Sequence, residues 1–160
     1  MKLASKHFEV EGIDISEYTI NSLKPIFGDK VRVSDIRNVK LNHNYFDIII
    51  IFNVLEHLND PYPIVKKIYE SANKKGLIIG SVPNYSPGVG LLFTWLVNTF
   101  IDSTHCSIYP PNYWYKLFNR AGFKKINFYG EFILNRNVSS YIKNKFWKYF
   151  SCNLIFICKK

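Results

Sequence analysis

The alternation of apolar and polar positions along the chain predicts short strands and helices joined by brief loops. The first third predicts a strand over Phe8–Ile15, a helix over Glu17–Ile26 and a second strand over Val31–Val33. The segment Asp47–Phe52 reads DIIIIF, a run of β-branched residues typical of a strand buried on both faces of a parallel sheet.

The rest of the chain continues this alternation. Pro61–Ala72 carries apolar residues at helical spacing, Lys74-Lys75-Gly76 is expected to close that helix, and Leu77–Val82 predicts the next strand. The remaining expected elements are helices at Tyr113–Ala121 and Ser139–Phe150 and strands at Lys125–Tyr129 and Asn153–Cys158. Strands that alternate with helices across short loops predict an α/β fold with a mostly parallel sheet.

Length and charge narrow the class of protein. A chain of 160 residues, 48% of them hydrophobic, is sufficient for one domain with a buried core, so residues 1–160 are expected to form a single domain. The formal net charge of +9 favours anionic partners. The basic residues are scattered in ones and twos, which also fits a solvated surface, so nucleic acid is an alternative partner and not the favoured one.

Cysteine usage and hydropathy bear on location. The three cysteines lack the spacing of a disulfide framework or a zinc site, which favours reduced thiols and a cytoplasmic protein. The most apolar stretch, Val89–Ile101, is well short of the roughly 20 residues that a membrane-spanning helix needs. We therefore expect no membrane span and interpret this stretch as a buried or interfacial helix.

In open parallel sheets, ligands bind beyond the carboxyl ends of the strands. Asp14, Asp35, Asn53 and Asn84 each follow an expected strand. A carboxylate at Asp14 could accept hydrogen bonds from both hydroxyls of a ribose, or it could cap the helix that starts near Ser16. Asp35 could accept from an adenine amine, although by itself it favours a local Asx turn.

Five stretches carry a family resemblance. VEGIDIS, VSDI, FDIIIIFNVLEHLNDP, KKGLIIGSVPN and HCSIYPPNYWYKLFNRAGF, in this order and spacing, resemble a class I S-adenosylmethionine-dependent methyltransferase of the small-molecule type, with a Leu-Glu-His elbow after its fourth strand. The resemblance implies a Rossmann-like, doubly wound sheet with an antiparallel last strand. It also implies S-adenosylmethionine as cofactor and methyl transfer to an O, N or C atom of a small molecule.

The resemblance assigns cofactor contacts to five positions. Asp14 would hold the ribose diol, and Ile15 would pack on the adenine. Asp35 would meet the adenine amine, with Ile36 beside the ring. Asn53 would lie next to the methionine part of the cofactor.

The resemblance places Glu56, His57, Asn84, His105 and Tyr109 around the acceptor. Because imidazole titrates near neutral pH, His57 and His105 are the candidate catalytic bases for an acceptor hydroxyl. Either histidine could instead serve only to orient the elbow or pin a loop. Residues 86–112 would form a substrate-covering insertion.

We also considered a metal on the elbow. Asn53, Glu56 and His57 are spaced so that they could converge, and some related O-methyltransferases bind a divalent metal on a Glu-x-x-Glu-His elbow. In this chain the first ligand would be Asn, a neutral and weaker oxygen donor, so no metal is expected.

One expected part of the family pattern is missing. The family opens with a strand that runs into a glycine-rich turn, Asp/Glu-x-Gly-x-Gly, and these 160 residues contain no such turn. We therefore expect an N-terminally truncated fold in which the edge of Asp47–Phe52 is exposed and can pair with a protein partner or with another copy. The alternatives to an enzyme are a non-catalytic methyltransferase-like interaction module or a fragment that needs a partner strand. We also considered an NAD-dependent oxidoreductase. The Leu-Glu-His elbow does not support this class, which also needs a glycine-rich turn.

Overall fold

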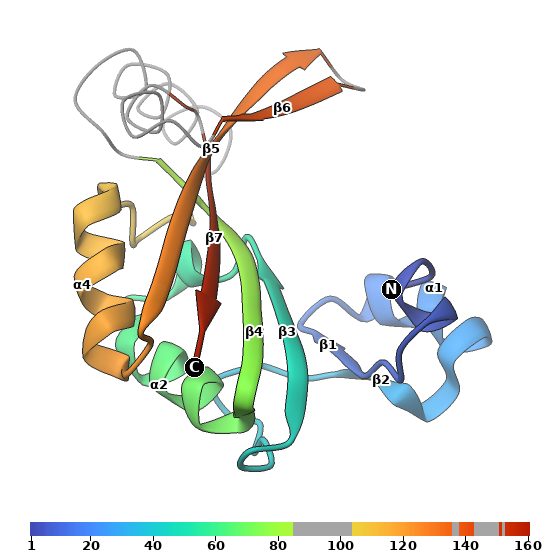
Figure 1. The fold of residues 1–160 in the computed structure, drawn as a ribbon. Coiled ribbons are helices and arrows are strands. Elements are labelled where there is room, and N and C mark those ends of the chain that lie inside the picture. The colour runs from blue at the N-terminus through green and yellow to red at the C-terminus, as the bar shows by residue number, and fades with distance from the viewer. Residues whose placement is uncertain (85–103, 136–137, 143–150, 152) are drawn as a thin grey trace. The chain divides into compact units, whose positions relative to one another are not determined.

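The computed structural model describes residues 1–84, 104–135, 138–142, 151 and 153–160 (Figure 1). The chain divides into two compact units, Met1–Lys40 and Leu41–Lys160. We describe each unit by itself, and the prediction of a single domain stays a prediction. Residues 86–103, which make up most of the predicted substrate-covering insertion (residues 86–112), lie outside the described residues, and so does the apolar helix expected at Val89–Ile101.

The first unit is a small strand, helix and strand arrangement. Its elements are η1 (Ala4–Lys6), β1 (Gly12–Asp14), α1 (Glu17–Phe27), η2 (Gly28–Lys30) and β2 (Val31–Val33). Strands β1 and β2 are parallel, with Gly12 opposite Val31. Ile20, Phe27 and Val31 form a buried cluster that Val10 and Leu23 partly enclose.

Local sequence signals set both ends of α1. The Ser16 hydroxyl accepts a hydrogen bond from the backbone N–H of Thr19 at 3.2 Å and caps the helix. The helix ends at Phe27 because Gly28 follows with φ 55°, in the left-handed region. The predicted strand over Phe8–Ile15 was too long, since only Gly12–Asp14 pairs with β2.

The second unit contains a five-stranded sheet. Its elements are β3 (Phe46–Phe52), η3 (Leu55–His57), α2 (Tyr62–Ser71), β4 (Ala72–Pro83), α4 (Pro111–Ala121), β5 (Lys125–Asn135), β6 (Val138–Ile142) and β7 (Asn153–Lys159). The strand order is β3-β4-β7-β5-β6. Strands β3 and β4 are parallel and joined through α2, whereas β7 runs antiparallel to both β4 and β5. The predicted α/β class and the antiparallel last strand are confirmed.

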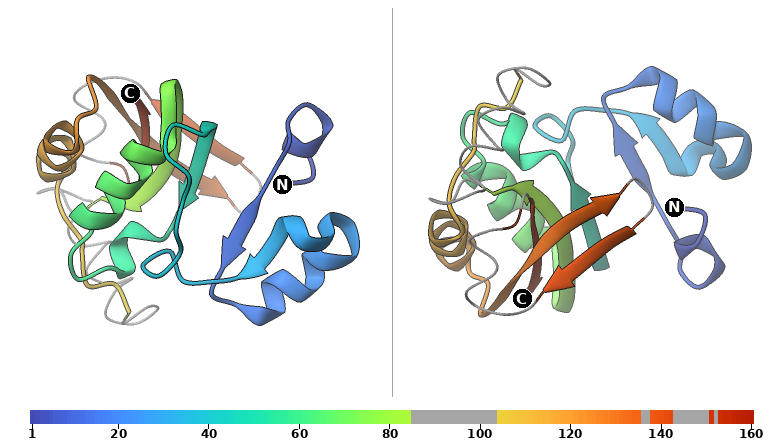
Figure 2. Two further views of the ribbon diagram at one scale, coloured as in Figure 1. Left: turned by 90° about the horizontal axis from the view of Figure 1, so that it is seen from below. Right: turned by 90° about the horizontal axis from the view of Figure 1, so that it is seen from above.

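Helices α2 and α4 cover the same face of this sheet (Figures 1 and 2). The apolar stripe of α2 (Ile64, Val65 and Ile68) is buried, as its spacing predicts. On α4, Phe118 is 1% exposed, and its ring centroid lies 4.7 Å from that of Phe156 on β7. The helix stops at Ala121 because Gly122 takes φ 119°.

The other face of β3 differs from the prediction. Ile48, Ile50 and Phe52 alternate along one side of the strand and are 37%, 56% and 50% exposed, while Ile51 on the opposite side is 7% exposed. The expectation that this strand is buried on both faces is therefore wrong. In the part of the second unit that is described, both helices pack on the Ile51 side, and β3 is the last strand of the sheet.

Two predicted helices also need correction. Helix α2 ends at Ser71, so Lys74-Lys75-Gly76 lies within β4 and does not close the helix. The predicted helix at Ser139–Phe150 is wrong for its first residues, because Val138–Ile142 is β6 and pairs antiparallel with β5. The β-branched and aromatic residues of VSSYI favour the strand. Residues 143–150 lie outside the described part.

Candidate functional site

Asp14 lies where the sequence placed it, at the carboxyl end of β1. Its Oδ1 accepts a hydrogen bond from the backbone N–H of Ser16 at 2.8 Å, and its backbone carbonyl accepts one from Ser34 at 2.9 Å. The Asp14 side chain therefore forms a local turn just before α1, whereas the residue that caps the helix is Ser16 and not Asp14. A carboxylate has about four acceptor positions, so this bond is compatible with a ribose diol at the same group. Ile15 beside it is 74% exposed and offers an apolar surface to a flat ring.

Asp35 follows β2 and forms the local turn that its sequence context favoured. Its Oδ1 accepts from the backbone N–H of Arg37 at 2.8 Å, and its Oδ2 accepts from the Arg37 guanidinium at 2.8 Å and 2.5 Å. The hydrogen bond and the negative charge of Asp35 raise the pKa of Arg37 above its usual value. Because Arg37 is solvent-exposed, this ion pair contributes little to stability. Ile36 lies between the two partners in the chain.

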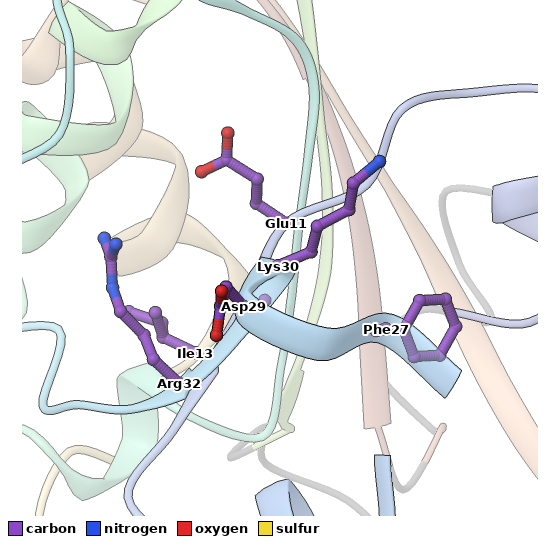
Figure 3. A pocket seen from close by; sticks show the side chains of 7 residues that line it. Glu11, Ile13, Phe27, Asp29, Lys30 and Arg32 are labelled. Carbon is purple, nitrogen blue, oxygen red and sulfur yellow. The ribbon is translucent and has the colours of Figure 1, made fainter. Parts of the chain in front are cut away.

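The first unit also has an open hollow of about 520 Å³. It is lined by Glu11, Gly12, Ile13, Phe27, Asp29, Lys30 and Arg32. Figure 3 shows that the charged ends of Glu11, Lys30 and Arg32 extend in different directions instead of meeting at one point. A small-molecule site needs a few polar groups that converge, and the predicted cofactor residues lie outside this lining. The hollow is therefore not the candidate site.

In the second unit, Asn53 forms the turn between β3 and the Leu-Glu-His elbow. It has φ 51°, a left-handed conformation that asparagine adopts more readily than most residues. Its Oδ1 accepts a hydrogen bond from the Ser81 hydroxyl at 3.0 Å, and Ser81 pairs with Phe52 across β3 and β4. Asn53 thus connects the carboxyl ends of two neighbouring strands and directs the chain into η3.

The elbow is fixed by a segment about 50 residues away in the sequence. The backbone carbonyl of Glu56 accepts hydrogen bonds from the N–H groups of Cys106 and Ser107, each at 2.9 Å. The Ser107 hydroxyl donates to the carbonyl of Leu58, and Ser107 is fully buried. This docking brings His105 to the elbow, which the sequence could suggest only through the family resemblance.

The two candidate bases lie next to each other. The ring centroids of His57 and His105 are 4.8 Å apart, with the rings inclined at 62°. The Thr104 hydroxyl lies 2.9 Å from His57 Nδ1. Glu56 is 1% exposed, His105 is half-buried and His57 is exposed. One ligand atom from each of these three side chains lies within 4.8 Å of the others.

The remaining predicted acceptor contacts have structural neighbours. Tyr109 stacks on Tyr113 with ring centroids 3.8 Å apart, and burial together with Tyr109 raises the pKa of Tyr113. Asn84 is fully buried, and its amide donates to the Ser151 carbonyl at 2.8 Å, so its side chain supports the ends of β4 and β7. Contact of either residue with an acceptor stays a prediction. Sequence reasoning did not single out Thr104 and Ser107, whose only signal was the polar stretch around His105.

The fold and the elbow define the class of protein, and the comparisons agree. The sequence matches the family described as "Methyltransferase domain" over residues 2–127. A search of curated proteins finds no match. The chain belongs to this methyltransferase family, which confirms the resemblance found in the sequence.

Solved structures share the fold at low identity. One is a methyltransferase of Thermotoga maritima, described as S-adenosylmethionine-dependent and as a possible histamine N-methyltransferase. It has a TM-score of 0.73 and 14% identity, and the match covers 93% of this chain and 72% of that one. An S-adenosylmethionine-dependent methyltransferase of Archaeoglobus fulgidus has TM-score 0.70 and 23% identity, covering 99% and 80%. Phosphoethanolamine N-methyltransferase 2 of Haemonchus contortus, in complex with S-adenosyl-L-methionine, has TM-score 0.65 and 17% identity, covering 79% and 31%.

The family match supports methyl transfer as the reaction and S-adenosylmethionine as the cofactor, and the solved neighbours show the shared fold. Within the described residues, every helix is too short or too polar to cross a bilayer.

Proposed function

We propose that this domain acts in methyl transfer from S-adenosylmethionine to a small-molecule acceptor. The observation that supports this most directly is the Leu-Glu-His elbow, which begins at the carboxyl end of a parallel strand and to which the segment bearing His105 is hydrogen-bonded. Open α/β sheets bind their ligands at these strand ends.

The residues of the first unit suit the adenosine end of the cofactor. The Asp14 carboxylate would accept from the two ribose hydroxyls, and the exposed Ile15 would pack against adenine. Asp35 and Ile36 would meet the edge of the base, with the Asp35 turn holding both in place. The chemistry of these donors and acceptors fits the cofactor.

The cofactor supplies a methyl group on a positively charged sulfur, and the acceptor's nucleophilic atom takes it in an in-line displacement as the carbon–sulfur bond breaks. The elbow would align the acceptor for this step. If the acceptor is a hydroxyl, His57 or His105 would take up its proton. The pairing of the two rings and the Thr104–His57 contact would hold an imidazole in a defined orientation.

The exposed side of β3 supports a protein partner for the domain. Within the described sheet β3 is the last strand, so the backbone N–H and C=O groups along its edge can pair with another strand. The apolar side chains of Ile48, Ile50 and Phe52 also leave one face of β3 for a partner to cover. We propose that the edge of β3 receives a parallel strand carrying the glycine-rich turn that the family uses for the methionine end of the cofactor.

Cofactor binding tests the proposed function. The natural polypeptide that contains these residues is titrated with S-adenosylmethionine in a calorimeter, beside its Asp14→Asn and Asp29→Asn variants. We expect binding that Asp14→Asn weakens at least about tenfold, because a charge-assisted hydrogen bond contributes roughly 1.5–3 kcal/mol. Asp29→Asn, an acid of the same unit outside the predicted cofactor residues, should bind like the native chain. No heat of binding from the natural polypeptide would refute the proposal.

The second candidate is a non-catalytic interaction module, which the exposed apolar face of β3 favours. It predicts a stable complex with a protein partner and no rise in melting temperature with S-adenosylmethionine. A cofactor-dependent rise of several degrees would count against it.

The free thiols of Cys106 and Cys158 support the cytoplasmic location that we propose for either function.

A further inference from the structure

We propose that Glu56, His57 and His105 form a binding site for a divalent transition-metal ion of the zinc class. The three side chains offer one carboxylate oxygen and two imidazole nitrogens within 4.8 Å of one another. Two imidazoles and one carboxylate form a donor set that binds zinc or iron and leaves coordination positions open. The ion would bind the same three side chains that line the proposed acceptor site, but its binding needs neither the cofactor nor the acceptor, so it can be tested separately from methyl transfer.

The spacing is close to what coordination requires. Ligand atoms at about 2.1 Å around a tetrahedral ion lie roughly 3.4 Å from one another. The separation of up to 4.8 Å therefore has to shrink by about 1.4 Å at its widest. Because His57 is exposed and His105 only half-buried, rotation of their side chains can close this gap without moving the sheet.

The surroundings of the three side chains resemble the support that metal ligands usually have. His57 Nδ1 lies 2.9 Å from the Thr104 hydroxyl, so Nε2 is the nitrogen left for an ion. The Glu56 carbonyl holds the next two residues after His105 by two backbone hydrogen bonds. These contacts hold the backbone of the elbow next to the His105 segment. Glu56 is buried, where a paired positive charge stabilises a carboxylate.

This site differs from the one considered on the sequence. That set needed Asn53 as first ligand, but the Asn53 Oδ1 accepts a hydrogen bond from Ser81 and belongs to the connection between β3 and β4. His105 takes the third place instead. Replacing a neutral amide oxygen with an imidazole moves the preference from oxygen-seeking ions such as Mg²⁺ to ions such as Zn²⁺. The expectation of no metal rested on Asn53 and therefore does not apply to this set.

Zinc titration of the untagged, metal-free chain tests the proposal. Calorimetry should give one Zn²⁺ per chain, and Co²⁺ should give the visible absorption of a four- or five-coordinate nitrogen and oxygen site. His57→Ala, His105→Ala and Glu56→Gln should each abolish the stoichiometric binding. Thr104→Ala should weaken binding by roughly 10- to 100-fold, as supporting residues of metal sites do.

Two matched controls separate this site from adventitious binding. His43→Ala removes an exposed histidine elsewhere in the same unit, and Cys106→Ser removes the neighbouring exposed thiol. Both variants should bind zinc like the native chain, and circular dichroism should show all variants folded. A native chain that binds no zinc, or His57→Ala and His105→Ala variants that bind it unchanged, would overturn the proposal. So would a Co²⁺ spectrum with intense sulfur-to-metal bands that Cys106→Ser removes.

Discussion

The attachment of the His105 segment to the elbow predicts a specific stability effect for Ser107→Ala. Ser107 is fully buried, its backbone N–H donates to the Glu56 carbonyl, and its hydroxyl donates to the Leu58 carbonyl. Alanine keeps the backbone bond and nearly the same volume, so the change removes one side-chain hydrogen bond from a buried place. The experiment therefore isolates one contact between two distant segments.

The expected magnitude follows from burial. A net hydrogen bond contributes about 0.5–1.5 kcal/mol, and a buried acceptor left without its donor costs about 1–3 kcal/mol. Leu58 is 7% exposed, so water has little access to its carbonyl once the hydroxyl is gone. We expect Ser107→Ala to lower the free energy of unfolding by about 1–3 kcal/mol.

Urea unfolding followed by circular dichroism measures this change. If the free energy of unfolding falls with urea concentration at the same slope in the variant and the native chain, the two unfolded states are comparable. Ser22→Ala is the matched control, because its hydroxyl donates to the Thr19 carbonyl on the exposed side of α1. The control should change stability by less than about 0.5 kcal/mol. An equally small effect of Ser107→Ala would refute the view that its hydroxyl attaches the His105 segment to the elbow.

Two further predictions concern the end of α4 and the buried thiol. Gly122→Ala should lower the melting temperature more than Gly28→Ala. Both glycines have positive φ, but an added Cβ at Gly122 would lie 2.6 Å from the Tyr69 ring, whereas a Cβ at Gly28 would meet open space. Backbone strain costs roughly 1–3 kcal/mol at each position. A stability loss at Gly122 no larger than the loss at Gly28, measured by calorimetry, would contradict the packing argument. Burial raises the pKa of Cys158 from 9.0 to about 12, so its thiol stabilises the fold below pH 9 and this contribution is lost as pH rises. The free energy of unfolding of the native chain, relative to Cys158→Ala, should be about 2 kcal/mol lower at about pH 10.5 than at about pH 8, and a constant difference would disprove it.

Local patterns were enough to predict several elements. Val31–Val33 forms a strand with the predicted bounds, and α4 ends at Ala121, before the glycine that the sequence marked as its stop. Periodicity and capping residues act within a few positions, so they are visible in the sequence. The family resemblance, which rests on the order of several such elements, is confirmed by the family match.

Patterns failed where a distant part of the chain decides the outcome. The DIIIIF run indicates a strand but does not show which faces are covered, and Ile50 is 56% exposed because both described helices of its unit lie on the other side. The sequence predicted a helix through most of Val138–Ile142, whereas this segment pairs with β5, which continues to Asn135. Which strand such a segment pairs with is decided by the tertiary structure.

The sequence by itself therefore determined the α/β class, the family and the elbow as the place where chemistry is expected. Only the tertiary structure decided that Glu56 is buried, that Asn53 is used between two strands, and that His105 lies beside His57. The Thr104–His57 contact joins residues 47 positions apart. No periodic pattern extends over such a distance, because the backbone hydrogen bonds from Cys106 and Ser107 to the elbow form only once the sheet has placed both segments at the same edge.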